Sequence, residues 1–187
     1  MKGQNTLSNI RKDGGEMSDI QIERLVKAAK RKDEHAFSKL IDLHMQALYK
    51  TAYAIVRNDD DAADAISETV LICWEKLSTL KKNQFFKTWI TRILINECYK
   101  ILKQNQNIIH FEDGVIEEGK EDESNLEFEE ALAILDEKYR VIVVLFYSQG
   151  FATKEIARIL NLPDATVRTR LSRAREQLKK YYEEQSV

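Results

Sequence analysis

The stretch from residue 152 to residue 180 constrains the fold most, because an Asn-Leu-Pro break separates two apolar-periodic segments there. In the second segment an apolar residue recurs at every third or fourth position, so these residues share one face of a helix. They are Val167, Leu171, Ala174 and Leu178. Two short helices joined by a tight break predict a helix-turn-helix.

The opposite side of this second helix carries hydroxyl groups and arginines. These residues are Thr166, Thr169, Ser172 and Arg173, with Arg168, Arg170 and Arg175 on the flanks. Short hydroxyl side chains let a helix approach base edges in a major groove, and guanidinium groups reach phosphates or guanine. A solvated amphipathic helix can have the same composition. Residues 154–180, however, contain eight basic and three acidic residues in a chain of formal net charge −2, and this segregation favours DNA binding.

The composition is typical of a globular protein, with 187 residues, 43% hydrophobic and 32% charged. One proline and six glycines in the whole chain favour helices throughout. No apolar run approaches the roughly 20 residues of a membrane-spanning helix. The first residues lack the apolar region of a secretory signal, which predicts a cytoplasmic protein, and residues 1–17 are expected to form a disordered leader.

Neither cysteines nor histidines form a recognisable site. Cys73 and Cys98 have no CxxC partner, and the three histidines lack the spacing of metal ligands, so no metal or cofactor is expected. Both cysteines lie on apolar helical faces, which favours buried thiols over a redox sensor. The chain also lacks a nucleophile-base set and a phosphate loop, so it is not expected to be an enzyme.

The first half of the chain predicts three helices, over residues 19–31, 33–57 and 60–77. Ser18 and Gln21 have the spacing of a capping box at the start of the first of these helices. Residues 59–75, which cover the third helix, contain six acids and no base. The helix dipole accounts for the aspartates of the first turn but not for Glu68 and Glu75, so a surface for a basic partner is favoured.

A basic segment with interleaved aromatic residues follows. Residues 76–103 contain seven bases and one acid. The aromatic residues are Phe85, Phe86, Trp89 and Tyr99. Rings among cations are typical of surfaces on which unstacked bases lie. Phe86 and Trp89 also fit an apolar stripe with Ile90, Ile93 and Leu94, and for Trp89 the core interpretation is favoured.

The predicted fold is all-α, with two helical domains, residues 18–105 and 125–187, joined by a flexible acidic linker, residues 106–124. Residues 112–130 contain ten acids and one lysine. This charge either keeps the linker away from DNA or lets it follow a basic channel. The apolar run 141–147 is rich in β-branched residues, but it is predicted to be helical because no second strand is available nearby.

This layout resembles the extracytoplasmic-function (ECF, group IV) sigma factors of bacteria, which belong to the sigma-70 family. The resemblance covers residues 22–180 and rests on the order and spacing of three phrases, DDAADAISETV, FKTWITRILIN and ATVRTRLSRAR. Members often have Gly and then Ser at the turn where this chain has Asn161 and Pro163. Asparagine tolerates the left-handed conformation that such a turn needs.

The resemblance implies that the first domain is sigma region 2 and the second is sigma region 4. Region 2 would dock on the β′ clamp of core RNA polymerase through Asp61, Asp64, Glu68 and Trp74. It would recognise the minus-ten element through Lys82, Asn83, Phe85, Phe86, Arg92, Asn96 and Lys100. Region 4 would bind the β flap and, through the second helix of the helix-turn-helix, the minus-thirty-five element.

The implied function is promoter recognition and strand opening during transcription initiation, with polymerase supplying the chemistry. Family members are usually held by an anti-sigma factor, often at the membrane, until an envelope stress signal arrives. The residues also leave two other hypotheses open. One is a one-component transcription regulator with an N-terminal effector or dimerisation domain, and the other is an adaptor that does not bind DNA. The basic and aromatic segment 81–103 separates them, because a repressor does not need a single-strand platform.

Overall fold

The computed structural model describes residues 17–108 and 130–185, and every regular element in them is helical. The elements are α1 (Asp19–Ala29), α2 (Glu34–Val56), α3 (Asp59–Lys76), η1 (Leu77–Thr79), η2 (Asn83–Phe85), α4 (Phe86–Ile108), α6 (Glu137–Val143), the π-helical turn η3 (Val144–Ser148), α7 (Thr153–Leu160) and α8 (Asp164–Gln185). The predicted all-α class is therefore confirmed. The predicted leader and most of the predicted linker lie outside the described residues.

Side-chain caps start the first three helices where the sequence predicts them. Ser18 and Gln21 form the capping box of α1. The Asp33 carboxylate accepts a hydrogen bond from the Ala36 amide at 3.0 Å and begins α2. Asn58 accepts from the Asp61 amide at 2.9 Å and begins α3. Each cap satisfies a backbone donor that the first turn of a helix leaves free.

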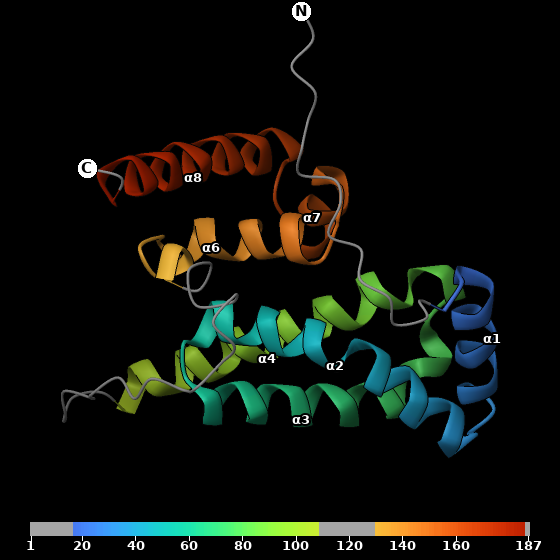
Figure 1. Cartoon of the computed structure of the whole chain (residues 1–187). Helices are drawn as coiled ribbons and strands as arrows, with labels where there is room; N and C mark the ends of the chain where they lie inside the picture. The colour runs from blue at the N-terminus through green and yellow to red at the C-terminus, as the bar shows by residue number, and fades with distance from the viewer. Residues whose placement is uncertain (1–16, 109–129, 186–187) are drawn as a thin grey trace, which may run out of the picture.

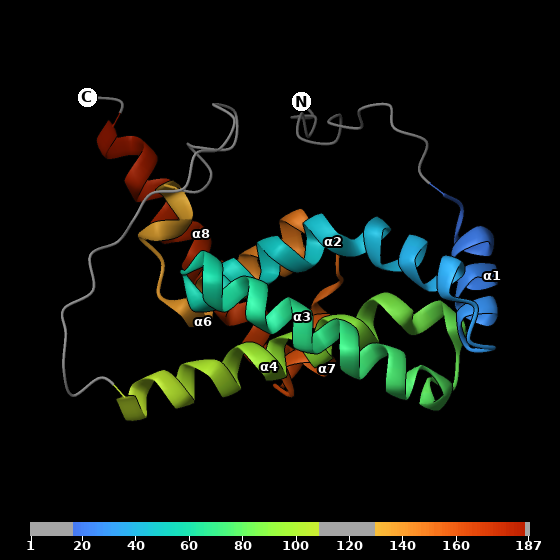
Figure 2. The ribbon, with the colours of Figure 1, turned by 90° about the horizontal axis from the view of Figure 1, so that it is seen from below.

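Helices α1–α4 form an N-terminal group around a shared apolar core. Figure 2 shows α2, α3 and α4 running side by side, with α1 across one end. The predicted inner stripe of α3 is confirmed, because its residues are buried or packed against the core. These residues are Ala62, Ile66, Thr69, Val70, Cys73 and Leu77. The stripe leaves the acidic side of α3 on the outside.

Helices α6–α8 form a C-terminal group, in which the apolar run 141–147 is helical, as predicted. Val141, Ile142 and Val143 are all buried in α6, which packs against α2 on one side and α8 on the other. A helix buried on several sides is apolar all round, which explains why the run has no helical periodicity in the sequence.

The two groups pack against each other and share a continuous core (Figure 1). Helix α6 lies against α2, and α7 lies against α4. Buried Arg140 donates hydrogen bonds from Nε to the Ala54 carbonyl at 2.6 Å and from Nη1 to the Leu135 carbonyl at 2.8 Å. The Ala54 carbonyl is in the last turn of α2, where a guanidinium also complements the helix dipole.

Two further hydrogen bonds join the groups near η3. Gln149 Nε2 donates to the Ala47 carbonyl at 3.0 Å, and Lys87 Nζ donates to the Gln149 carbonyl at 2.5 Å. Lys87 also lies 4.9 Å from the centre of the Phe151 ring. In the bonds from Arg140 to Ala54, from Gln149 to Ala47 and from Lys87 to Gln149 the acceptor is a main-chain carbonyl.

No helix within residues 17–108 and 130–185 has the length and apolar character needed to cross a membrane. In Figure 1, α3 and α8 lie on opposite outer sides of the molecule, with α2, α4 and α6 between them. The acidic helix α3 and the basic helix α8 are therefore separated in space.

Candidate nucleic-acid interface

Helix α8 presents most of the predicted DNA-facing residues to the outside. Val167, Leu171 and Ala174 are buried beneath it, as predicted. On the other side, Arg168, Thr169, Ser172, Arg173 and Arg175 are exposed, and Thr166 is half-buried. Thr169 Oγ1 donates to the Ala165 carbonyl at 2.9 Å, which leaves its methyl group and hydroxyl lone pairs outward.

The turn before α8 has the geometry that the sequence predicts. Asn161 ends α7 in the left-handed conformation, with φ 52° and ψ 47°. Asp164, the first residue of α8, forms an ion pair with Arg168 at 3.3 Å. This carboxylate partly neutralises the arginine and holds it along the helix.

Two arginines of α8 are placed differently from the others. Arg170 is half-buried and lines a cavity against α4, so in this arrangement it is directed away from the predicted DNA-facing side. Arg175 Nε donates to the Tyr147 hydroxyl at 2.7 Å, and the guanidinium lies within 6 Å of the Phe146 and Tyr147 rings. Arg175 is thus fixed by η3, whereas Arg173 extends freely into solvent.

The loop before α4 carries the next set of predicted residues. Lys82 and Phe85 are exposed, and the Lys82 ammonium lies 5.9 Å from the centre of the Phe85 ring. Phe85, with 42% of its surface exposed, is an available platform for a base. Asn83 is half-buried, and its side-chain oxygen accepts a hydrogen bond from Lys30 at 2.7 Å.

Phe86 does not fit the minus-ten role that is predicted for it. Its side chain is only 1% exposed and packs edge-on against His44, with ring centres 5.2 Å apart. Burial of a ring in the core outweighs any contact that it could make with a base at the surface. Trp89 is half-buried and packed against the core, in agreement with the core role that the sequence favours for it.

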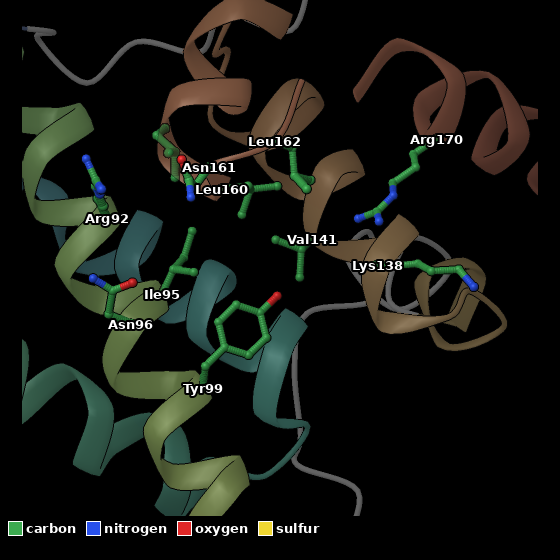
Figure 3. A pocket seen from close by; sticks show the side chains of 11 residues that line it. Arg92, Ile95, Asn96, Tyr99, Lys138, Val141, Leu160, Asn161, Leu162 and Arg170 are labelled. Atoms are coloured by element: carbon green, nitrogen blue, oxygen red, sulfur yellow. The ribbon is translucent and has the colours of Figure 1, made fainter. Parts of the chain in front are cut away.

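Arg92, Asn96 and Lys100 lie on one exposed face of α4, at intervals of four residues. Lys100 pairs with Glu97 at 3.0 Å. Arg92 and Asn96 line a cavity of about 330 Å³, whose other wall comes from the C-terminal group (Figure 3). That wall includes Asn161, Leu162 and Arg170. The face of α4 that is predicted to read DNA is thus turned toward α7 and α8.

Tyr99 projects into the same cavity from α4, as Figure 3 shows. Burial raises the pKa of Tyr99 above its ordinary value, and a hydrogen bond with Glu137 of α6 raises it further. The phenol therefore stays neutral and contributes a polar contact between the two groups.

The outer side of α3 carries the predicted polymerase-binding residues. Asp64 and Glu68 are exposed. Asp61 is half-buried and its carboxylate accepts a hydrogen bond from Asn105 at 3.0 Å. Trp74 lies at the edge of this side, where its ring packs on Phe37. The carboxylates form a continuous acidic strip along the helix.

Sequence reasoning missed an apolar residue in the middle of this strip. Leu71 is 60% exposed and lies three residues after Glu68 on the same side of α3. An exposed leucine surrounded by carboxylates is a suitable contact for the centre of a protein interface. Its helical spacing with the acids was the available signal. Arg140, Gln149 and Lys30 were also missed, and their contacts with distant residues leave no signal in the sequence.

The thiols and the metal candidates add no site within the described residues. Burial raises the pKa of Cys73 and of Cys98 to about 12, so both are neutral thiols at physiological pH. No cluster of three or more His, Cys, Asp or Glu side chains suited to a metal occurs in residues 17–108 and 130–185.

Both halves of the chain match sequence families with a common role. Residues 40–108 match the family described as Sigma-70 region 2, and residues 125–178 match Sigma-70, region 4. The matches fall on the N-terminal and C-terminal groups and in the same order as the predicted domains. A one-component regulator has no reason to carry a region 2, so this alternative is set aside.

Curated relatives match this chain over most of their own length. The chain is 26% identical over 181 residues to "ECF RNA polymerase sigma factor SigW" of Bacillus subtilis, covering 87% of this chain and 97% of the relative. It is 32% identical over 135 residues to "RNA polymerase sigma factor SigV" of the same species, covering 70% of this chain and 81% of the relative.

Solved structures share the fold. RpoE of Bartonella quintana, solved in complex with the anti-sigma factor NepR, has a TM-score of 0.66 and 25% identity, covering 79% of this chain and 96% of RpoE. CnrH, solved with the cytosolic domain of CnrY, has a TM-score of 0.66 at 23% identity, with coverage of 87% and 97%. With regions 2 and 4 in order and relatives matched along most of their length, the chain belongs to the extracytoplasmic-function sigma factors.

Proposed function

We propose that the chain binds core RNA polymerase, recognises a two-part promoter and opens the strands for transcription initiation. One observation carries this proposal, namely that a single chain presents an acidic strip on α3 and a basic, hydroxyl-bearing side on α8 at opposite outer sides of the molecule. A protein that only binds DNA has no use for the first surface. A protein that only binds protein has no use for the second.

Polymerase docking is assigned to α3. The acidic strip of Asp61, Asp64 and Glu68, with Trp74 at its edge, would contact the β′ clamp, and exposed Leu71 would fill an apolar position at the centre. The C-terminal group would contact the β flap. Catalysis belongs to polymerase, and the chain supplies binding energy and position only.

Minus-ten recognition is assigned to the loop before α4 and to the face of α4. Phe85 would stack on an unpaired base, Lys82 would neutralise phosphate, and Asn83 would contact a base edge. Arg92, Asn96 and Lys100 would continue this surface along α4. Phe86 is excluded from it, because its contribution is to the core beneath the loop.

Minus-thirty-five recognition is assigned to the exposed side of α8, with Thr169, Ser172 and Arg173 at base edges. Arg168 and Arg175 would contact phosphates. Arg170 lines the cavity against α4 and Thr166 is half-buried, and both would join this surface once the two groups separate.

We also infer that an anti-sigma factor holds the chain in the compact arrangement. The likeness to RpoE, which was solved with the anti-sigma factor NepR, supports this inference. In the compact arrangement the cavity beside Arg92 and Asn96 is walled by α7 and α8. Such a factor would hold the chain in the cytoplasm or beneath the membrane until a cell-envelope stress releases it.

Run-off transcription with core polymerase and a promoter selected from a random library would test the proposal. We expect core polymerase plus the chain to initiate at selected promoters, and core polymerase alone to remain inactive on them. The result against the proposal is a chain that binds the selected DNA tightly by itself yet never directs initiation.

A further inference from the structure

We propose that Lys30 is a positioning residue that sets the base preference of the promoter-reading loop by fixing the orientation of the Asn83 amide. The proposal rests on the proposed function and adds a residue to it. Lys30 precedes residue 40, where the match to region 2 begins.

The geometry joins the end of α1 to a loop some fifty residues further along the chain. Lys30 is the C-cap of α1, and its ammonium donates to the Leu80 carbonyl at 2.5 Å and to Asn83 Oδ1 at 2.7 Å. Both acceptors are in the loop between α3 and α4, which lies beside α1 in Figure 1. One half-buried lysine thus holds both the backbone and the base-reading side chain of this loop.

A second lysine, from the turn between α1 and α2, contacts the last turn of α3 just before the loop. Lys32 has the left-handed φ of 66°, which turns the chain so that its ammonium donates to the Trp74 carbonyl at 3.1 Å. The same ammonium lies 4.4 Å from the centre of the Trp74 ring. The turn between α1 and α2 therefore contacts the last turn of α3 and the loop that follows, and this limits the freedom of the loop.

The chemistry of the contact decides which way the amide of Asn83 faces. An ammonium group only donates hydrogen bonds, so the amide oxygen must face Lys30 and the NH₂ group must point away from it. An unrestrained asparagine could present either its donor or its acceptor. Lys30 converts Asn83 into a donor toward the cavity of about 470 Å³ that Asn83 lines with Phe85.

A base that is read by this donor must offer an acceptor. Carbonyl oxygens and unprotonated ring nitrogens accept from the NH₂ group, whereas exocyclic amines, such as those of adenine and cytosine, do not. The positive charge of Lys30 further disfavours an amine at the same place. The loop should therefore prefer, at one minus-ten position, a base edge that presents an acceptor without a neighbouring amine.

The test uses core polymerase with the full chain and a promoter library randomised over the minus-ten element. Lys30→Met removes the contact, Lys30→Arg keeps a donor, and Asn83→Asp keeps the contact with Lys30 but replaces the NH₂ donor by an acceptor. Lys27→Met, an exposed lysine one turn earlier in α1, is the matched control. Sequencing of the transcribed promoters measures the base preference.

We expect Lys30→Met to flatten the preference at one minus-ten position about tenfold, as the loss of one oriented hydrogen bond predicts. Lys30→Arg and Lys27→Met should keep the preference. Asn83→Asp should move it toward adenine or cytosine, and the minus-thirty-five preference should not change in any variant. A merely structural role for Lys30 would lower transcription from all promoters equally.

Unchanged minus-ten preference in Lys30→Met and Asn83→Asp would overturn the proposal. If Lys30→Met does not fold, as a thermal unfolding scan would show, Asn83→Asp decides by itself. If the unmodified chain does not initiate with core polymerase, the proposed function fails. If the unmodified chain initiates selectively and the variants do not differ from it, the assignment of Lys30 alone fails.

Discussion

The outer side of α3 and the exposed face of α4 belong to the same group of helices, but they differ in what faces them. Asp64, Glu68 and Leu71 of α3 are exposed to solvent, and α3 itself lies on the side of the molecule opposite α8. Arg92 and Asn96 of α4 line a cavity with the C-terminal group. The surface proposed for polymerase is thus available in the compact arrangement, whereas the surface proposed for DNA is partly covered. This difference favours an order in which polymerase binds first and DNA second.

The largest expected effect comes from breaking the contact that holds the two groups together. Arg140→Met removes the guanidinium of a residue that is only 8% exposed and leaves the Ala54 and Leu135 carbonyls without this donor. We expect a loss of about 3 kcal/mol in the free energy of unfolding. Small-angle scattering should show a larger radius of gyration, because the face of α4 is uncovered.

Arg158→Met, which removes an exposed arginine of α7, is the matched control and should change neither quantity. An unaltered unfolding free energy and radius in Arg140→Met would mean that Arg140 does not hold the compact arrangement.

A reversal of charge on α3 should affect polymerase without affecting the fold. The double substitution Asp64→Lys and Glu68→Lys places like charges opposite the basic surface expected on the clamp. We expect the affinity for core polymerase to fall by about 2.5 kcal/mol, measured by titration of labelled chain with core enzyme. Thermal stability should be retained because both side chains are exposed. The double substitution Glu34→Lys and Asp42→Lys on α2 is the control, because it changes the net charge by the same amount at two exposed sites. Equal losses in both variants would show that only net charge matters.

Substitutions on α8 should change the choice of sequence, because this helix is open to solvent. Arg173→Ala should change base preference in the minus-thirty-five element by about 1–3 kcal/mol. Arg168→Ala should instead weaken binding to all sequences and reduce its dependence on salt. Selection of promoters with each holoenzyme distinguishes the two. The same base preference in Arg173→Ala and in the unmodified chain would remove Arg173 from the reading surface.

The smallest expected effect is a dependence of the free energy of unfolding on pH, through His44. Burial lowers the pKa of His44 below 6.5, although a hydrogen bond with the Leu40 carbonyl opposes this shift and nearby Lys87 adds to it. The unfolded chain therefore binds the proton more readily than the folded chain. The contribution of neutral His44 to the free energy of unfolding should be fully present above pH 6.5. It should decrease as the pH falls below this value, by at most about 1.4 kcal/mol for each pH unit.

Urea unfolding at pH 7.5 and pH 5.5 measures this dependence. The His44→Gln variant should lose the part of the pH dependence that His44 causes. The His35→Gln variant, altered at an exposed site, should retain it. If both variants follow the unmodified chain, another group controls the pH dependence.

Much of the fold could be predicted because its determinants are local. Asp33 and Asn58 cap helices from within three residues, and the inner stripe of α3 follows helical spacing. The helical structure of the apolar run in α6 could also be predicted, because no second strand is available nearby to pair with it. Each of these signals lies within a few residues of the feature that it predicts.

The site could be predicted only in part, because several of its residues depend on contacts between distant segments. The spacing that places Arg170 on a flank of α8 says nothing about α4 beside it. Phe86 fitted both an aromatic platform and a core stripe, and the packing of His44 against its ring decided for the core. Asn83 was predicted as a base contact, but the lysine that orients it comes from α1.

The hydrogen bonds from Arg140 and Gln149 to α2 have an evolutionary consequence, because their acceptors are main-chain carbonyls. Arg140 and Gln149 require only that residues 54 and 47 leave their carbonyls accessible, as the small alanines at these positions do. The side chains on the accepting helix can therefore be replaced by other small ones without compensating changes across the boundary. A search for correlated substitutions among relatives should find little trace of these two hydrogen bonds, even where closure of the two groups is maintained.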